Sequence, residues 1–308
     1  MFLWGAPGIG KSSVVRQIGD AQKLPVTDIR AALLDPTDLR GIPAVVDGRA
    51  VWAPPGFLPH DPASKGILFF DELSAAPPLV QASLYQLTLD RRVGDYVLPD
   101  GWRIIAAGNR ATDASISFRM PAALANRFVH LDFEVDFNDW RTWAVSYGIH
   151  PLVMAFLSLR RELLFQQPGS TLAFATPRSW EMVSDVLHEF GSIGKAEDIL
   201  LGVIGEGPAL EFINYAENAL QEEEVRRILA DPEHADLPEE LGDLYALVSY
   251  VTAQAKDKAI RQAGGKLLPR LDPEFGVLLV RDLLSAAPSF ISNKDCSRFL
   301  AEHKELIL

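Results

Sequence analysis

The residues best suited to chemistry form a glycine-rich stretch near the start of the chain. The spacing GxxxxGKS is satisfied within Gly5, Ala6, Pro7, Gly8, Ile9, Gly10, Lys11, Ser12 and Ser13. Glycines let the backbone curl so that successive N–H groups point at phosphate oxygens. Lys11 can reach the β- and γ-phosphates of a nucleotide, and the Ser12 hydroxyl can ligate Mg²⁺. The spacing predicts a phosphate-binding loop, and the alternative is a glycine turn of no chemical role.

Two carboxylates, Asp71 and Glu72, follow the unbroken apolar run 66–70. Such a run is typical of a central parallel strand buried on both faces. Ligands of open α/β sheets bind at the carboxyl ends of the strands, so we expect both side chains to face the glycine loop. Asp71 would then hold the metal, and Glu72 would polarise an attacking water. The alternative is a pair of surface acids that cap a helix.

A second buried strand is expected at 102–107, and it is followed by Gly108 and Asn109. Asn109 could hydrogen-bond the attacking water beside Glu72. Asparagine after glycine is, however, often only a turn residue.

Arg178 is a cation in the first turn of a predicted helix. Thr176 fits the N-cap and Pro177 the first helical position. A cation there interacts unfavourably with the helix dipole, at a cost of about 0.3–1 kcal/mol. An anion bound in front of the turn would make the position of the cation favourable instead. A nucleotide γ-phosphate is the obvious anion. The alternative is pairing of Arg178 with a nearby acid. We expect one buried stripe on this helix, made of Trp180, Val183, Leu187 and Phe190.

The elements that must position these residues follow from the apolar patterns. A short strand, 1–4, precedes the loop, and Val14, Val15 and Ile18 mark the helix after it. Asp47-Gly48 and Gly94-Asp95 each indicate a two-residue β-hairpin turn. From Asp136 onward the pattern is helical, with Asn138 as the expected first cap, Gly148 as a stop and Pro151 as the next start.

We therefore predict an α/β fold: a P-loop NTPase αβα core with a parallel sheet, followed by an all-α lid and a C-terminal helical region. The expected domains are the core at 1–136, the lid at 137–205 and the C-terminal extension at 206–308. Since Met1 falls inside the first strand, we expect the lead-in segment common before such strands to be missing.

Composition restricts the class of protein. A net charge of −12 with a pI near 5.0 disfavours a nucleic-acid surface as the main partner. The single cysteine, Cys296, cannot form an internal disulfide and suits a reducing cytoplasm. No apolar run approaches a membrane span, so we expect a soluble cytoplasmic protein. The histidines and the cysteine show no metal-ligand spacing, which leaves nucleotide Mg²⁺ as the only expected metal. The acids at 222–224 indicate a solvated helix face, or less often a docking surface for a basic partner.

In chain order, these residues resemble the motifs of AAA+ ATPases: Walker A at 5–12, Walker B at Asp71-Glu72, sensor 1 at Asn109, the arginine finger at Arg127 and sensor 2 at Thr176-Pro177-Arg178. The resemblance covers about residues 1–190. Within that superfamily the chain is similar to the MoxR group of the helix-2-insert clade, whose members carry two hairpins at the places predicted above.

The resemblance implies ATP and Mg²⁺ as cofactors and ATP hydrolysis as the activity. Ser12 and Asp71 would hold the metal, Glu72 would activate water, and Asn109 would orient it. Arg127 would complete the site of a neighbouring subunit, with Arg119 as an alternative. Activity would therefore need a homo-oligomer, expected as a hexameric ring. MoxR-like proteins act as chaperone-like remodellers of protein clients, often beside a partner with a von Willebrand factor A domain.

Two other functions remain open at this stage. The chain could be a nucleotide-gated binding module with weak hydrolysis, whose working surface is the acidic C-terminal region. It could also be a DNA- or GTP-dependent motor like the restriction-associated branch of the clade. The segment after Asn109 lacks the NKxD spacing by which many GTPases recognise guanine.

Overall fold

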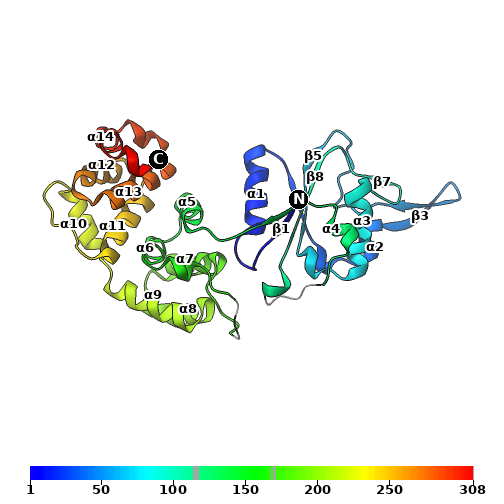
Figure 1. Ribbon diagram of the computed structural model, residues 1–308, viewed down its shortest axis with the longest axis horizontal. Helices are drawn as coiled ribbons and strands as arrows, with labels where there is room; N and C mark the ends of the chain where they lie inside the picture. The colour runs from blue at the N-terminus through cyan, green and yellow to red at the C-terminus, as the bar shows by residue number, and fades with distance from the viewer. Residues whose placement is uncertain (114–117, 168, 170, 308) are drawn as a thin grey trace. The chain divides into compact units, whose positions relative to one another are not determined.

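The computed structural model describes residues 1–113, 118–167, 169 and 171–307. The chain divides into two compact units, Met1–Glu134 and Val135–Leu308. Figure 1 shows the elements of each unit.

The first unit is built on a five-stranded sheet with the order β2-β5-β8-β1-β9. The strands are β1 (Phe2–Trp4), β2 (Val26–Arg30), β5 (Lys65–Asp71), β8 (Gly101–Gly108) and β9 (His130–Asp132). All four neighbouring pairs are parallel. The carboxyl ends of the strands therefore lie at one edge of the sheet. Of the predicted site residues, Asp71 is the last residue of β5, and Asn109 directly follows β8.

Helices cover both faces of this sheet (Figure 1). They are α1 (Lys11–Gln22), α2 (Pro36–Arg40), α3 (Pro78–Asp90) and α4 (Ala122–Ala125). The alternation along β5 explains the layering: Ile67 and Phe69 join the cluster that includes Val15 of α1, whereas Leu68 and Phe70 join the cluster of α3 and α4. The predicted αβα core with a parallel sheet is confirmed.

Both predicted hairpins form. The first joins β3 (Ile42–Val46) to β4 (Arg49–Ala53), and the second joins β6 (Arg92–Val93) to β7 (Tyr96–Val97). Asp47 and Gly48 both have positive φ, of 51° and 72°, as a type I′ turn requires. The β3–β4 hairpin extends away from the sheet (Figure 1) and leaves Ile42, Val45 and Val46 exposed.

The second unit is helical throughout its described elements. The α-helices are α5 (Phe137–Tyr147), α6 (Pro151–Leu159), α7 (Pro177–Phe190), α8 (Glu197–Ile204), α9 (Glu206–Asn218), α10 (Glu222–Ala230), α11 (Leu241–Ala253), α12 (Lys258–Leu267), α13 (Pro273–Ala286), α14 (Lys294–Glu302) and α15 (Lys304–Ile307). One hydrophobic cluster spans α5 to α9 and a second spans α10 to α14. The first cluster includes Phe212 and Ile213 of α9, so it extends past residue 205, where the predicted lid ends.

The ends of α5 and the start of α6 test three predictions, of which one was wrong and two are confirmed. The N-cap of α5 is Asp136, whose carboxylate accepts the Asp139 N–H, whereas Asn138 lies inside the helix. The prediction of Asn138 was wrong because two polar residues preceded the apolar pattern and either could cap it. Gly148 ends α5 at φ 92°, and Pro151 opens α6, as predicted.

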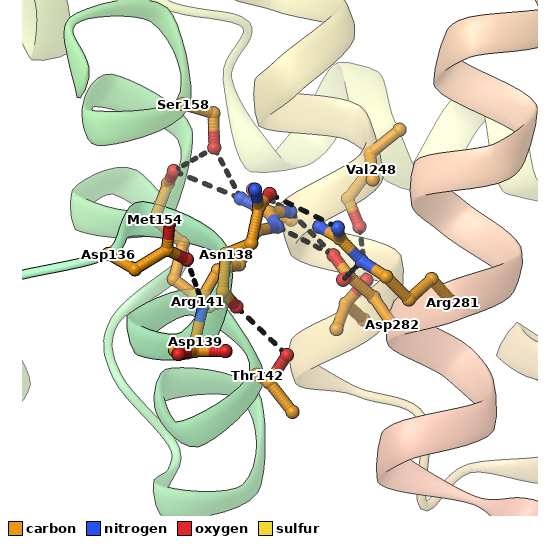
Figure 2. Close-up of polar contacts among 12 residues, drawn as sticks. Asp136, Asn138, Asp139, Arg141, Thr142, Met154, Ser158, Val248, Arg281 and Asp282 are labelled. Atoms are coloured by element: carbon orange, nitrogen blue, oxygen red, sulfur yellow. Dashed lines mark hydrogen bonds and ion pairs between the residues drawn. The ribbon is translucent and has the colours of Figure 1, made fainter.

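A buried ion pair connects four helices of the second unit (Figure 2). Arg141 of α5 is fully buried and donates to Asp282 of α13, with Nε–Oδ2 and Nη2–Oδ2 distances of 2.8 and 2.7 Å. Its Nη1 also donates to Met154 O at 3.2 Å and to Ser158 Oγ, both on α6. Nη2 lies 3.5 Å from Ser249 Oγ of α11. This cluster of polar contacts around Arg141 therefore joins α5 and α6 to α11 and α13.

Among the residues that the structure describes, no helix combines the length and the apolar character needed to cross a membrane. Nor do the described His, Cys, Asp and Glu side chains form a group of three or more that could hold a metal ion. Cys296 is a buried free thiol, and burial raises its pKa.

Candidate functional site at the carboxyl edge of the sheet

The glycine loop joins β1 to α1, which is the predicted strand–loop–helix order. Gly8 and Gly10 adopt φ of 78° and 101°, in the left-handed region that favours glycine. A Cβ on Gly5 would lie 2.5 Å from the Phe133 carbonyl oxygen and 2.6 Å from Ile9 Cδ1, so a side chain there would clash. Gly10 is the N-cap of α1 and supplies no side-chain cap to the first-turn N–H groups. Those donors and the positive end of the helix dipole suit an anion.

Lys11 connects the loop to the end of β8. Its ammonium donates to Gly5 O at 2.6 Å, to Ala6 O at 2.7 Å and to Asn109 Oδ1 at 2.9 Å. The side chain is buried. The structure therefore brings together Lys11 and Asn109, two of the predicted site residues, although they are 98 positions apart.

Ser12 and Asp71 form the second contact between the loop and the sheet. Ser12 Oγ donates to Asp71 Oδ2 at 2.6 Å, and the Glu72 N–H donates to Asp71 Oδ1 at 2.9 Å. Both carboxylate oxygens are thus fixed. Mg²⁺ prefers hard oxygen ligands and is commonly bound by one or two carboxylates together with substrate phosphates and water. The hydroxyl and carboxylate oxygens of Ser12 and Asp71 fit that ion.

Glu72 has an unusual backbone for its residue type. Its φ of 56° and ψ of 31° lie in the left-handed region, where a residue with a Cβ loses about 1–2 kcal/mol relative to the right-handed one. The side chain is exposed, and its Oε1 lies 4.0 Å from Arg30 Nη1 at the end of β2. Strained backbone of this kind persists where the surrounding structure fixes it, and it is concentrated at functional sites. Arg30 was not predicted as a neighbour of Glu72.

Ser74 is a neighbour of Asn109 that the sequence did not reveal. Its hydroxyl accepts the Asn109 N–H at 3.0 Å and is itself buried. A Cβ on Gly108 would lie 2.7 Å from that same oxygen, so glycine is needed for the approach. Nothing in the sequence around Ser74 indicates this contact, because its partner Asn109 lies 35 positions later in the chain.

Arg127 lies just after α4 and makes its contacts with Tyr85 of α3. Its guanidinium carbon is 5.5 Å from the centre of the Tyr85 ring, and its Nη2 donates to the Tyr85 hydroxyl at 3.2 Å. The arginine is exposed, whereas Tyr85 is half-buried against the core. Arg119, the alternative, is also exposed, and none of the described residues of its unit pairs with it.

Arg178 belongs to the second unit and lies in the first turn of α7. Thr176 caps that helix by accepting the Ser179 N–H at 3.0 Å, and Pro177 is its first residue, as predicted. Arg178 is exposed, and no acid among the described residues of its unit pairs with it. Trp180, Val183 and Leu187 are buried, but Phe190 is 40% exposed because the helix ends there at Gly191. Whether Arg178 serves the nucleotide stays a prediction.

Comparisons with solved structures give only a distant likeness. A RuvB mutant of Thermotoga maritima is 15% identical, with 85% of this chain and 79% of that chain covered and a TM-score of 0.34. NtrX from Brucella abortus in complex with ADP is also 15% identical, with 100% and 64% covered and a TM-score of 0.37. These values are too low to transfer a function. Among curated proteins, a search finds no match to this chain.

The family comparison is more specific. Residues 1–128 match the family model of the AAA domain, dynein-related subfamily. The match covers nearly all of the first unit and includes the glycine loop, the Asp71-Glu72 pair, Asn109 and Arg127. Over residues 1–128 this chain is therefore similar to AAA domains of the dynein-related subfamily.

Proposed function

We propose that this chain binds ATP with Mg²⁺ in the glycine loop and hydrolyses it, and that it does so as an oligomer. The observation that carries the proposal is the pair of contacts Lys11–Asn109 and Ser12–Asp71, which bring two polar side chains, one from the end of β5 and one from the residue after β8, to the same loop.

The arrangement suits phosphoryl transfer to water. The loop N–H groups and the Lys11 ammonium would bind the phosphates, because a charged phosphate oxygen is a stronger acceptor than the carbonyls of Gly5 and Ala6. Ser12 and Asp71 would hold Mg²⁺, which neutralises charge that develops on the phosphates. Glu72 would accept the proton of the attacking water, and the Asn109 amide would orient that water.

The oligomer is part of the proposal because Arg127 contacts Tyr85 rather than the loop of its own subunit. In this proposal Arg127 completes a neighbour's site, where such arginines supply about 10³–10⁵ in rate. A ring of six subunits is the expected form. Arg178 is included as the residue that senses the γ-phosphate, on its residue type and its place after Pro177.

The client is proposed to be a protein, as for a MoxR-like remodeller, and a partner with a von Willebrand factor A domain is one candidate. The exposed Ile42, Val45 and Val46 of the β3–β4 hairpin give an apolar surface that could contact it. Loss of client binding on replacing these three residues by serine, with turnover unchanged, would support that contact.

The test of catalysis compares ATP binding and turnover of the wild type with Glu72→Gln. We expect Glu72→Gln to bind ATP and to lose turnover. Equal rates would favour the second candidate, a nucleotide-gated binding module with weak hydrolysis. Turnover per subunit should also rise with protein concentration across the assembly range, and a constant value would contradict a shared site.

A DNA- or GTP-dependent motor is the remaining alternative. It predicts stimulation by DNA at low salt, because binding to phosphates depends strongly on salt. It also predicts turnover of GTP at least equal to that of ATP. Neither effect is expected here.

A further inference from the structure

The surroundings of Arg127 suggest a role for a residue outside the recognised motifs. Tyr85 lies in the middle of α3, where a helical pattern alone would make it an ordinary core residue. It is half-buried, and its ring packs against the cluster that includes Leu124 and Phe128 on either side of Arg127.

The contact between the two side chains has two components. The guanidinium lies over the ring, with 5.5 Å between its carbon and the ring centre, a distance at which a cation is attracted to the π face. The hydroxyl accepts a hydrogen bond from Nη2 at 3.2 Å. A flexible exposed arginine is thereby held at one place on the surface of its own subunit.

Order at this place matters if Arg127 acts on a neighbour. A long side chain loses conformational freedom when it is fixed, and that loss is smaller if the side chain is already ordered before the neighbour docks. The short helix α4, of four residues, is closed by Asn126 and offers Arg127 no side-chain partner there. Tyr85 supplies the partner from a helix 42 positions earlier.

We propose that Tyr85 is a positioning residue for Arg127, which orders the guanidinium for insertion into the nucleotide site of the adjacent subunit. This inference rests on the proposed function, since it assumes that Arg127 acts in trans. It concerns the subunit that donates the arginine, so a Tyr85 defect should leave the nucleotide site of the same subunit intact.

The test uses full-length chains with single substitutions. Tyr85→Leu removes the ring and the hydroxyl, and we expect turnover to fall about 10- to 100-fold, the size of effect that a small misplacement of a catalytic group produces. Tyr85→Phe keeps the ring and should retain most of the turnover. ATP affinity should be unchanged in both variants. Arg127→Ala serves as the reference for complete loss of the arginine.

Mixed assemblies separate positioning from general damage. A Lys11→Ala subunit cannot turn over ATP but carries an intact Tyr85 and Arg127. Mixing it with Tyr85→Leu subunits should raise the turnover per Tyr85→Leu subunit several-fold, as it should for Arg127→Ala subunits. A merely structural defect of Tyr85→Leu would not be rescued in this way.

The outcomes are distinct. Suppose that Arg127→Ala loses turnover and is rescued in mixed assemblies. If Tyr85→Leu is then fully active, or is impaired without rescue, the positioning role of Tyr85 is wrong and the shared site stands. If Arg127→Ala keeps full turnover, the trans role of Arg127 is wrong, and the role of Tyr85 falls with it.

Discussion

The Lys11 ammonium donates a hydrogen bond to Asn109 Oδ1 over 2.9 Å, which connects the glycine loop to the end of β8. The Asn109 backbone is held in turn by the Ser74 hydroxyl of the segment after β5. Two other segments of the first unit therefore hold Asn109 in place, one at its side chain and one at its backbone.

Asn109→Ala should lower turnover more than it lowers ATP affinity. Removal of one positioned polar group from a catalytic site typically costs about 10²–10³ in rate. The phosphate-binding N–H groups of the loop remain, so binding should change less than tenfold. Steady-state turnover and nucleotide titration measure the two effects. Equal losses in both would mean that Asn109 serves binding rather than reaction.

Asp71→Asn should change the dependence of turnover on Mg²⁺. The amide is a weaker ligand for a hard cation than a carboxylate and cannot accept from both Ser12 and Glu72 in the same way. We expect a higher Mg²⁺ concentration at half-maximal turnover and a lower maximum. A variant with an unchanged Mg²⁺ titration would show that Asp71 does not serve the metal.

Glu72→Gly should unfold at higher denaturant concentration than Glu72→Ala. Both substitutions remove the carboxylate, but only glycine adopts the φ of 56° without a Cβ penalty, so the difference should be about 1 kcal/mol. Neither variant should turn over ATP. If Ala were the more stable of the two, the strained backbone would be absent in solution.

Arg141 and Asp282 should show strong coupling in a double-mutant cycle. Removal of Arg141 leaves the buried Asp282 carboxylate with Arg281 Nε at 3.6 Å as its remaining ion-pair partner, and removal of Asp282 leaves the buried Arg141 guanidinium without a carboxylate. Breaking a buried pair by removing one member costs about 3–5 kcal/mol, whereas replacement of both by apolar residues is often neutral. Arg141→Met and Asp282→Leu should therefore each destabilise far more than the double variant. Urea unfolding measures all four proteins.

The control for this cycle is Glu224→Ala. It breaks an exposed pair with Arg227 on α10 of the same unit and should cost less than about 1 kcal/mol. A double variant as unstable as the sum of its two single variants would contradict the coupling.

His150 should make the second unit less stable below neutral pH. Burial lowers the pKa of His150 from 6.5 to about 4, and the nearby His188 contributes a smaller effect in the same direction. Glu222 acts in the opposite direction. Because the folded pKa lies below the unfolded one, the stabilisation is complete above about pH 6.5 and is lost as the pH falls toward 4. Between pH 8 and 5.5 the expected loss is on the order of 1 kcal/mol.

His150→Asn is the matched variant, because asparagine can replace the ring nitrogen that accepts the Leu152 N–H at the start of α6. Its stability should fall less than that of the wild type over the same pH range, as measured by urea unfolding at each pH. Identical pH profiles for the two proteins would rule out this role of His150.

Local patterns in the sequence were sufficient for much of the fold. The apolar runs that became β5 and β8, the Asp47-Gly48 turn and the Pro151 start of α6 each depend on neighbouring residues only. The glycine loop could be predicted for the same reason, since Gly5 to Ser12 lie within one short stretch.

Contacts between distant positions could not be predicted. Nothing near Ser74, Tyr85 or Arg30 in the sequence indicates Asn109, Arg127 or Glu72, because those pairings arise only when β2, β5 and β8 align and α3 packs on the sheet. The wrong N-cap at Asn138 has a different cause, since Asp136 and Asn138 have equal capping ability and only the entry of the chain into α5 selects between them.

The buried pair of Arg141 and Asp282 also constrains how this protein can change over generations. A lineage that loses either member first must pass through an ancestor less stable than the chain before or after it. The two positions are therefore expected to be exchanged together or not at all, even though 141 positions of sequence separate them.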